Sequence, residues 1–570
     1  MKSKNARNFV LGLIAGSVAL LVAAAFRIFA GGLFIPELAS QTLFSLTPGE
    51  VESFSVETFG SLAKYTAFTT AIIVNLVIYG VLAILLHKTY VRLSNKSVIV
   101  NLIQLSFIPY LVMVAISAFL LQLNELLTGS SEIQYVLLFL LLPSVGYGGT
   151  LSYLFQRRRG TAAKRIAASK ASTPETQEQE GGGEEEGRKK NPELSTTGSR
   201  VRRITRREFI TMAAATVVVA IFVFWARSFP FHSKSSMPTS RSNVPLPPTS
   251  TNIPAGSIFA EEALAPLVAS ELTPNDKFYR IDTNLIVPSV DANTWRLNVR
   301  GLVRNGPLQF TYDELKGMPS TSEYATLECI SDKIDGDLIS TAYWKGVPLK
   351  TILEQAQVLP GAIYIVFRCS DGYDVGIPLD RGLMEGTILA YEMNGVPLPA
   401  EHGFPVRAIV PGLYGMMNAK WITDIELVDT VYEGFWQRRG WANNAKYQTH
   451  SKIAFPGNAL RNRIEELSID ALTVGSKSPI AGVAFAGDRG ISKVEVSMDG
   501  GNTWHNASIK DPLSSNSWVL WALDWIPQNK GKYNIVVRAT DKTGNVQTAE
   551  IRDNYPNGAT GYHSVEETVA

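Results

Sequence analysis

The chain has 570 residues, of which 46% are hydrophobic and 18% charged, and its 53 Lys and Arg residues nearly balance its 51 Asp and Glu residues. A net charge of +2 does not favour nucleic acid as a partner, because nucleic-acid binders concentrate basic residues on one face. The only cysteines, Cys329 and Cys369, exclude a disulfide scaffold and an iron–sulfur cluster held by four thiolates. A Cys-x-x-Cys-His motif for covalent haem is also missing.

The first part of the chain is typical of a membrane protein. A helix needs about 20 predominantly apolar residues to cross a bilayer, with an accepted range of about 17–25. The stretches that meet this requirement are Phe9–Phe26, Ala67–Leu86, Val98–Leu121, Ile133–Phe155 and Phe209–Ala226. We therefore predict an all-α bundle of five transmembrane helices, four of them within residues 1–156 and the fifth at 209–226.

Basic residues indicate the orientation of these helices. They precede the first span, separate the second from the third, and follow the fourth, as Lys2, Lys4, Arg7, Lys88, Arg92, Lys96 and a large cluster between Arg157 and Arg207. The alternate loops carry only Lys64. The positive-inside rule then places the N-terminus in the cytoplasm and everything after Ala226 outside it. This predicts a multi-pass protein of the cell membrane whose C-terminal portion is extracytoplasmic.

Two connectors flank the fifth span. Residues 157–208 contain a glycine run and a glutamate run, which predict a disordered, basic cytoplasmic linker. Residues 227–254 are rich in Ser, Pro and Thr and predict an extended tether. Arg206 and Arg207, followed by Phe209 and an apolar run, resemble a twin-arginine export signal. Two further positive-inside anchors are the alternative interpretation.

The membrane region offers few ligands for chemistry. His87 is its only histidine and it has no cysteine, so a pair of axial ligands for a b-type haem cannot be found there. Its spans also lack the charges that mark ion paths, which disfavours a transporter. We interpret this region as an anchor or a docking surface.

The extracytoplasmic portion divides by pattern into an α+β domain at residues 255–460, a small immunoglobulin-like β-sandwich at 461–555 and a tail at 556–570. The predicted strands are Trp295–Val303, Ala362–Arg368, Ile480–Phe485, Ser492–Met498, Ser517–Trp525 and Tyr533–Thr540, and the predicted short helices are Tyr312–Leu315 and Leu349–Ala356.

Several motifs in this portion occur in a recognisable order. They are Thr273-Pro274-Asn275-Asp276-Lys277-Phe278-Tyr279-Arg280, Thr326-Leu327-Glu328-Cys329-Ile330-Ser331, Gly336-Asp337-Leu338-Ile339, Trp344-Lys345-Gly346-Val347-Pro348-Leu349, His402-Gly403-Phe404-Pro405-Val406-Arg407, Val410-Pro411-Gly412, Lys420-Trp421-Ile422, and Val494-Glu495-Val496-Ser497-Met498-Asp499-Gly500-Gly501-Asn502-Thr503-Trp504. In series, over roughly residues 255–552, they resemble the sulfite oxidase family of molybdopterin enzymes, including its C-terminal dimerisation domain.

The resemblance implies a role for each cysteine. Cys329 matches the family's thiolate ligand to molybdenum, and soft sulfur donors suit such a metal. A buried apolar thiol is the alternative interpretation of Cys329. Cys369 lies in a strand-like run, where packing in the core or a position near the pterin is expected.

The resemblance also implies contacts to the pterin and its terminal phosphate. The matching residues are Asp276, Tyr279, Arg280, His402, Arg407, Asn418, Ala419 and Lys420. Arg407 and Lys420 match the phosphate positions, and guanidinium geometry suits a phosphate. Ordinary surface charge is the alternative, but the apolar run around Arg407 predicts a buried, paired guanidinium.

The sequence departs from true sulfite oxidases at three places. Asp282 replaces a histidine, Asp332-Lys333-Ile334-Asp335 replaces arginines that bind the sulfite dianion, and Trp441 replaces the catalytic tyrosine. Carboxylates after the cysteine would repel an anion, and Trp441 can donate a hydrogen bond but cannot ionise as a phenol does. The predicted catalytic residues are Cys329, Arg280, Asp371, Tyr373 and Trp441. Turn formation and aromatic packing are the alternative roles of the last three.

These features predict an extracytoplasmic molybdopterin-dependent oxidoreductase that performs two-electron, oxygen-atom-transfer chemistry on a small substrate. Because the chain lacks its own haem or cluster, electrons would pass to or from a cytochrome or a quinone-linked membrane protein. The family resemblance implies a possible homodimer. The alternatives are a reductase of S- or N-oxides, or a membrane-tethered binding or assembly protein with a decayed cofactor site.

Overall fold

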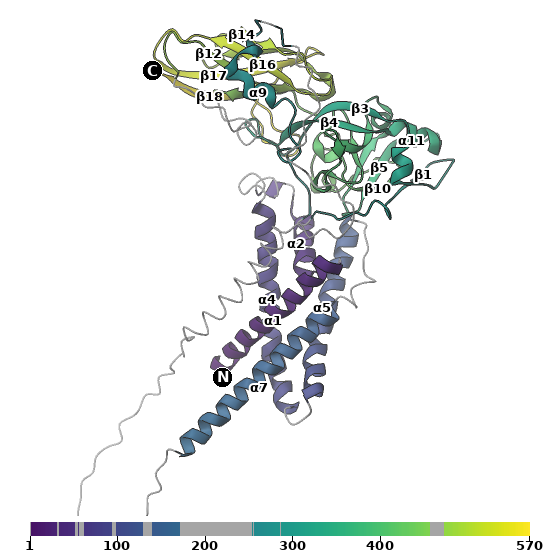
Figure 1. Ribbon diagram of the computed structural model, residues 1–570, viewed down its shortest axis with the longest axis vertical. Helices are drawn as coiled ribbons and strands as arrows, with labels where there is room; N and C mark the ends of the chain where they lie inside the picture. The colour runs from purple at the N-terminus through teal and green to yellow at the C-terminus, as the bar shows by residue number, and fades with distance from the viewer. Residues whose placement is uncertain are drawn as a thin grey trace, which may run out of the picture. The chain divides into compact units, whose positions relative to one another are not determined.

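The computed structural model describes residues 2–30, 34–48, 50–51, 55, 62–93, 98–128, 140–171, 253–254, 256–284, 287–456 and 472–570. The chain divides into two compact units, one built from N-terminal helices and one that holds the described sheets (Figure 1). The predicted fifth span, the twin-arginine motif and nearly all of the tether lie outside the described residues.

The N-terminal unit is helical. Its long helices are α1 (Lys2–Ala30), α4 (Leu62–Leu93), α5 (Val98–Thr128) and α7 (Leu141–Ala171), and a shorter helix is α2 (Ile35–Leu46). Within the described residues, three stretches are long and apolar enough to cross a membrane: Lys4–Arg27, Tyr65–Val91 and Ile103–Leu120. They coincide with the first three predicted spans.

The structure differs from prediction in two parts of this unit. Helix α7 overlaps the fourth predicted span and continues to Ala171, so residues 157–171 of the predicted disordered linker are helical. The predicted loop after the first span contains α2. There Glu37 is buried and accepts two hydrogen bonds from Arg27, at 2.6 and 2.9 Å. This pair explains how α2 tolerates a carboxylate inside the unit.

Close helix packing in this unit depends on small residues. A Cβ added at Gly12 of α1 would lie 2.6 Å from the carbonyl oxygen of Tyr79 in α4, and one at Gly16 would lie 2.7 Å from the Cβ of Tyr79. The Tyr147 hydroxyl of α7 donates to the same Tyr79 carbonyl at 2.7 Å. Glycines therefore let α1 approach α4 as small residues do at helix interfaces in membranes.

In the second unit, described residues 253–449 form what we call the first domain, which holds two sheets. One sheet has the order β2 (Leu308–Thr311), β1 (Arg296–Gly301), β10 (Ile422–Val428), β5 (Tyr364–Cys369), β6 (Asp374–Pro378). The other contains β3 (Thr321–Glu328), β4 (Ile339–Pro348), β7 (Ile388–Met393) and β8 (Val396–Pro397), with β9 (Arg407–Ile409) on the edge of β7. Only the β1–β10 pair is parallel among the described pairs of these sheets.

Short helices connect the strands of the first domain. They are α9 (Ala265–Ala269), α10 (Tyr312–Lys316), α11 (Leu349–Ala356) and α12 (Leu379–Leu383), with 3-10 turns at Ile258–Ala260, Glu262–Leu264, Ala400–His402, Gly415–Met417 and Gln437–Arg439. The Thr311 and Glu314 side chains form a capping box at α10. The predicted strands and helices of this domain are confirmed, with end shifts of one or two residues.

The C-terminal domain, described residues 450–456 and 472–570, consists of two four-stranded sheets. Their orders are β11 (His450–Phe455), β12 (Ser478–Phe485), β16 (Val519–Trp525), β15 (Ser508–Ile509), and β14 (His505–Asn506), β13 (Ile491–Ser497), β17 (Gly531–Asp541), β18 (His563–Val569), with a 3-10 turn at Gly487–Arg489. The four predicted strands are confirmed as β12, β13, β16 and β17.

Two boundaries differ from prediction. Residues 556–570 are not a loose tail, because β18 pairs with β17 from Gly531↔Val569 to Val537↔His563. Strand β11 lies before the predicted boundary at 460 but pairs with β12 of the C-terminal sheet. In both cases the pairing partner is distant in sequence, so local composition does not reveal the strand.

The first sheet of the C-terminal domain is buried on both faces. Along β16, Leu520 and Ala522 pack in the core of the first domain, whereas Val519 and Trp521 pack against the second sheet. Successive strand residues point to opposite faces, so this alternation follows from the pleat. The same alternation in β11 sends Ile453 to the second sheet, and the preceding Lys452 toward the first domain. The two domains therefore share a continuous core.

Candidate functional site

Cys329 is the first residue of the connection between β3 and β4. The antiparallel register ends at Glu328↔Ile339, so residues 329–338, which we call the cysteine loop, connect the two strands. The Cys329 amide donates to the Leu338 carbonyl at 2.9 Å, and its Sγ lies 3.0 Å from the Ser331 hydroxyl. Burial raises the pKa of the Cys329 thiol to about 11. The thiol is therefore neutral at pH 7 unless a metal displaces its proton, as soft cations do.

Arg407 is a buried cation without a carboxylate partner in the described part of the chain. Its guanidinium donates to the carbonyls of His402 at 3.2 Å and Asn418 at 3.4 Å, and its Nε has no hydrogen-bond partner. The guanidinium carbon lies 4.9 Å from the centre of the Trp344 ring. Burial lowers the pKa of Arg407 to about 10, so it remains charged at neutral pH. The predicted burial of Arg407 is confirmed. Its printed partners are backbone carbonyls, and its Nε–H is left for an anion.

His402 connects two of the motifs. Its Nε2–H donates to the Asn275 carbonyl at 2.7 Å, and its ring meets Phe278 edge-on at 5.4 Å between centroids. Burial, with the nearby Lys420 and Arg407 charges, lowers the pKa of His402 to about 3. His402 is therefore a neutral side chain that orients the segment before Arg407.

Tyr279 brings the first motif close to Cys329. A Cβ added at Gly415 would lie 2.3 Å from the Tyr279 hydroxyl, so the 3-10 turn at Gly415 permits this approach. Burial raises the pKa of Tyr279 well above its ordinary value, and the charge of a Cys329 thiolate raises it further while Arg407 lowers it. Tyr279 is therefore near enough to both Cys329 and Arg407 for their charges to affect it, and their binding of one cofactor stays a prediction.

Asp282 connects the second group of predicted residues. Its buried carboxylate accepts from Arg280 Nε at 2.8 Å and from Lys420 Nζ at 3.3 Å, and also from the Asn284 amide at 3.1 Å. The Asn284 side chain in turn donates to the Asp371 carboxylate at 2.6 Å. Burial raises the pKa of Asp371. Asp282 carries one negative charge and pairs with two cations, so it neutralises one of them.

Tyr373 and Asp371 form the expected turn. The Asp371 carboxylate accepts from the Tyr373 amide at 3.0 Å, and the Tyr373 hydroxyl donates to the Met416 carbonyl at 2.6 Å. Burial raises the pKa of Tyr373 well above its ordinary value; neighbouring Cys369 and carboxylates contribute, as does Cys329. Asp371 and Tyr373 therefore form a turn, and Tyr373 is near enough to Cys329 for a thiolate charge there to raise its pKa.

Trp441 packs against the C-terminal domain. Its ring meets Tyr555 edge-on at 5.2 Å between centroids, and its indole Nε1–H is buried without a hydrogen-bond partner. Aromatic packing is therefore realised. An unpaired buried donor is uncommon in proteins and fits an acceptor on a bound molecule.

Other predicted cofactor residues have structural partners. The Asn418 side chain accepts from the Val410 amide at 2.6 Å and donates to the Leu413 and Tyr414 carbonyls, both at 3.1 Å. Because these bonds occupy its amide, the side chain shapes the segment instead of offering a free donor. The Ala419 carbonyl accepts from the Ala408 amide at 2.8 Å.

The last two predicted cofactor residues differ in burial. Cys369 is buried at the end of β5, opposite Ile422 of β10, which fits the packing role. Asp276 has an exposed side chain. The structure does not bring Asp276 into the buried group around Cys329.

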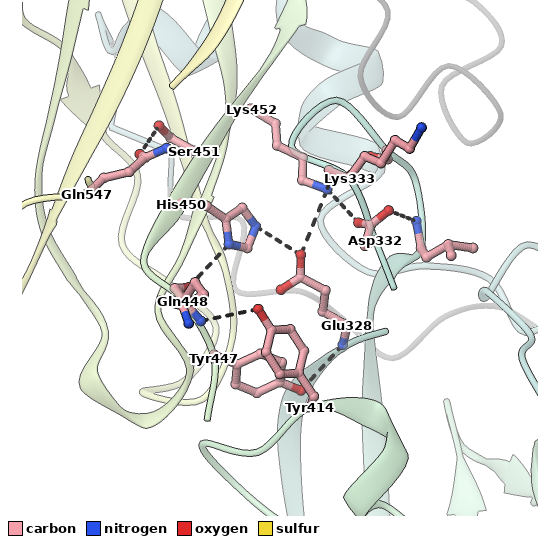
Figure 2. A network of polar contacts seen from close by, with 12 residues as sticks. Glu328, Asp332, Lys333, Tyr414, Tyr447, Gln448, His450, Ser451, Lys452 and Gln547 are labelled. Carbon is pink, nitrogen blue, oxygen red and sulfur yellow. Dashed lines mark hydrogen bonds and ion pairs between the residues drawn. The ribbon is translucent and has the colours of Figure 1, made fainter. Parts of the chain in front are cut away.

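The structure also shows a buried charged network that sequence reasoning missed (Figure 2). Lys452 Nζ lies 2.5 Å from the Asp332 carboxylate and 3.9 Å from that of Glu328. His450 Nε2 lies 3.3 Å from Glu328. Burial raises the pKa of Glu328 well above its ordinary value. The prediction that Asp332 repels an anion is therefore wrong, because Lys452 neutralises this carboxylate. The available signal was a lysine directly before the apolar residues Ile453–Phe455.

Comparisons with known proteins agree with these features. The oxidoreductase molybdopterin binding domain matches residues 284–436, and the Mo-co oxidoreductase dimerisation domain matches residues 445–565. Mitochondrial sulfite oxidase of Rattus norvegicus is 32% identical over 320 residues, which cover 49% of this chain and 58% of the relative. The chain thus spans little more than half the length of such mammalian relatives.

Further relatives are covered more fully. Sulfite oxidase of Gallus gallus is 30% identical over 51% of this chain and 72% of its own length, and the uncharacterized oxidoreductase YuiH of Bacillus subtilis is 34% identical over 26% of this chain and 74% of its own length. The solved sulfane dehydrogenase SoxCD of Paracoccus pantotrophus covers 50% of this chain and 79% of its own, at 24% identity and a TM-score of 0.44. From the matched domains and these sequence relatives, the chain belongs to the sulfite oxidase family of molybdopterin-dependent oxidoreductases.

Proposed function

We propose that this chain is a membrane-anchored molybdenum-cofactor oxidoreductase in which Cys329 binds the metal and Arg407 and Lys420 bind the terminal phosphate of the pterin. The observation that carries the proposal is Arg407, which is 5% exposed, has no carboxylate partner among the described residues and keeps an unpaired Nε–H. A buried guanidinium in this state fits a phosphate, which accepts two parallel hydrogen bonds.

The bound cofactor supplies the two-electron, oxygen-atom-transfer chemistry, and the protein supplies position and electrostatics. Cys329 loses its proton on binding a soft metal, because its thiol is otherwise neutral. Lys420 adds a second positive charge near the phosphate, and the neutral His402 holds the segment that precedes Arg407. Tyr279 belongs to the same candidate site, and Gly415 leaves room for its hydroxyl.

We propose a small, uncharged substrate in place of the sulfite dianion. Asp282 neutralises one of the Arg280 and Lys420 charges, and the cysteine loop has no arginine. Both features weaken attraction for a dianion. Asp371, Tyr373 and Trp441 are the candidate residues on the substrate side, together with Arg280.

A reductase of S- or N-oxides is the second candidate, and Trp441 favours it. Its buried Nε1–H has no partner, so it can donate to the oxygen of a neutral oxide. Oxidation and reduction differ only in the direction in which the oxygen atom and two electrons move, so the same residues serve both.

The proposed location is the cell membrane, with the first domain and the C-terminal domain on the extracytoplasmic side. The three apolar stretches support the first three spans of the proposed five-span topology, and the alternation of basic loops in the sequence supports its orientation. The fourth span and the twin-arginine-type fifth span are proposed from the sequence pattern. The second unit would exchange electrons with a separate cytochrome or quinone-linked membrane protein. An immunoglobulin-type C-terminal sandwich would form a homodimer, as the matched dimerisation domain suggests.

The proposal is tested on the full chain, purified in detergent from a host that makes molybdopterin. We expect near-stoichiometric molybdenum in the unaltered chain and an altered metal absorption spectrum in Cys329→Ser. Cys369→Ser is the matched control, because this buried cysteine packs in β5, and its spectrum should match that of the unaltered chain. Folded but metal-free protein from a competent host would instead support the binding or assembly alternative.

A further inference from the structure

Lys452 places an ammonium group in the interior of the second unit. The residue is only 1% exposed and projects from β11 of the C-terminal domain toward the first domain (Figure 2). Its Nζ donates to the Asp332 carboxylate at 2.5 Å and to the carbonyls of Lys333 and Gly336 at 3.2 and 3.0 Å. An ammonium group has three N–H donors, so this geometry satisfies all of them.

Every one of these acceptors belongs to the cysteine loop. Asp332 also accepts from the Leu338 amide at 3.0 Å, through its other oxygen. The Leu338 carbonyl accepts from the Cys329 amide at 2.9 Å. Lys452 is therefore connected to the backbone of Cys329 through Asp332 and Leu338, by consecutive hydrogen bonds that close the loop on itself.

The loop has little freedom to rearrange around this contact. A Cβ added at Gly336 would lie 2.1 Å from the Asp332 carboxylate, so the loop is packed tightly at its centre. Asn554, another residue of the C-terminal domain, donates to the Ser331 carbonyl at 2.7 Å. The C-terminal domain thus holds the loop both beside Cys329 and on its far side.

A buried ion pair is weak evidence for stability, because desolvation offsets much of its attraction. The net contribution of the Lys452–Asp332 pair to stability is therefore not what distinguishes it from other buried contacts. What Lys452 provides in addition is a fixed geometry for three oxygen atoms of one short loop.

We propose that Lys452 is a positioning residue of the metal site, through which the C-terminal domain sets the conformation of the cysteine loop and the direction of the Cys329 thiol. This rests on the proposed function, since it takes Cys329 as the metal ligand. The C-terminal domain would then act on the metal site of its own chain, in addition to any role in dimerisation.

The test compares Lys452→Met with Lys510→Met in the full chain. Lys510 is the matched control because it is also a lysine of the C-terminal domain that binds a buried carboxylate of the first domain. Its Nζ donates to the Glu271 carboxylate at 2.8 and 3.0 Å. Glu271 lies outside the cysteine loop. Both substitutions remove a buried inter-domain ion pair, but only one removes a contact to the loop.

The first readout is the rate at which iodoacetamide alkylates Cys329 in cofactor-free protein, resolved by peptide mass spectrometry with Cys369 as the internal reference. We expect Lys452→Met to raise the Cys329 rate at least about tenfold, because local opening exposes a buried thiol. Lys510→Met should leave it unchanged. The second readout is the Mo(V) electron paramagnetic resonance spectrum of the loaded protein, which should shift only in Lys452→Met.

Equal thermal destabilisation by both variants, with an unchanged Cys329 rate and an unchanged spectrum, would overturn the proposal. If Lys452→Met does not accumulate, Lys452→Met with Asp332→Asn is measured, because the second substitution removes the charge of the carboxylate that Lys452 contacts at 2.5 Å. Failure of the proposed function is distinguishable: Cys329→Ser would then leave the metal spectrum unchanged, whereas the alkylation result concerns the loop alone.

Discussion

Lys452 and Arg407 are buried cations of the second unit whose surroundings differ. Lys452 donates all of its N–H groups to oxygens of the chain, and one of these oxygens belongs to a carboxylate. Arg407 donates to two backbone carbonyls and keeps an unpaired Nε–H. A buried cation that is satisfied within the chain holds its neighbours in place, whereas one that lacks an anion favours binding one. The difference separates a positioning site from a ligand site.

Lys452→Met should have the largest effect on stability, and it tests whether Lys452 holds its neighbours in place. We expect it to lower the free energy of unfolding by about 3–5 kcal/mol, because it leaves the buried Asp332 carboxylate without a counter-charge. Urea unfolding of the full chain in detergent, followed by tryptophan fluorescence, measures this. Lys493→Met removes a lysine whose side chain is 47% exposed and should change stability by less than about 0.5 kcal/mol. An unchanged urea midpoint in Lys452→Met would contradict the prediction.

Acidification tests the neutral histidines beside the two cations. Burial lowers the pKa values of His402 and His450 to about 3, with contributions from Arg407 and Lys452 respectively. The unfolded chain binds a proton on each histidine near pH 6.5, whereas the folded chain does not until near pH 3. Their stabilising contribution is therefore complete above pH 6.5 and decreases as the pH falls toward 3.

At pH 5 this loss is about 2 kcal/mol for each histidine. His450→Gln should therefore reduce the difference in unfolding free energy between pH 7 and pH 5 by that amount. His505→Gln, at an exposed position of β14, is the control for the substitution itself. Equal pH dependence in His450→Gln and the unaltered chain would show that burial does not lower the pKa of His450.

Arg407→Met tests whether Arg407 serves a ligand and not the stability of the folded chain. No carboxylate loses its partner, so we expect the unfolding free energy of cofactor-free protein to change by no more than about 1 kcal/mol. Molybdenum bound per chain should fall at least about tenfold, which corresponds to about 1.4 kcal/mol. Arg407→Lys should fall between the two, because an ammonium group lacks the forked geometry of guanidinium. A large loss of stability in cofactor-free Arg407→Met would make Arg407 a structural cation like Lys452.

Trp441→Phe has the smallest expected effect on stability. It removes an N–H that has no partner and keeps most of the ring that packs on Tyr555. The unfolding free energy should therefore change by less than about 0.5 kcal/mol. If the N–H contacts the substrate, KM should rise without a comparable change in cofactor content. Tyr555→Phe is the control for packing, and an effect of equal size in both variants would assign Trp441 to packing alone.

The sequence by itself determined the local elements and the cofactor class. Helix α11 has the predicted bounds because its apolar spacing is a local property. The series of motifs over roughly residues 255–552, taken together, indicated the family. It also correctly predicted that Arg407 is buried, from the apolar residues on both sides.

Only the tertiary structure decided which charges meet. Asp332 and Lys452 are 120 residues apart, so neither composition nor spacing pairs them, and Asp332 was expected to repel an anion. Strand β18 was likewise expected to be a tail, because its pairing with β17 is non-local. Propensity and hydrophobic periodicity act over a few residues, whereas the partner of a buried charge or an edge strand is set by the packing of the whole unit.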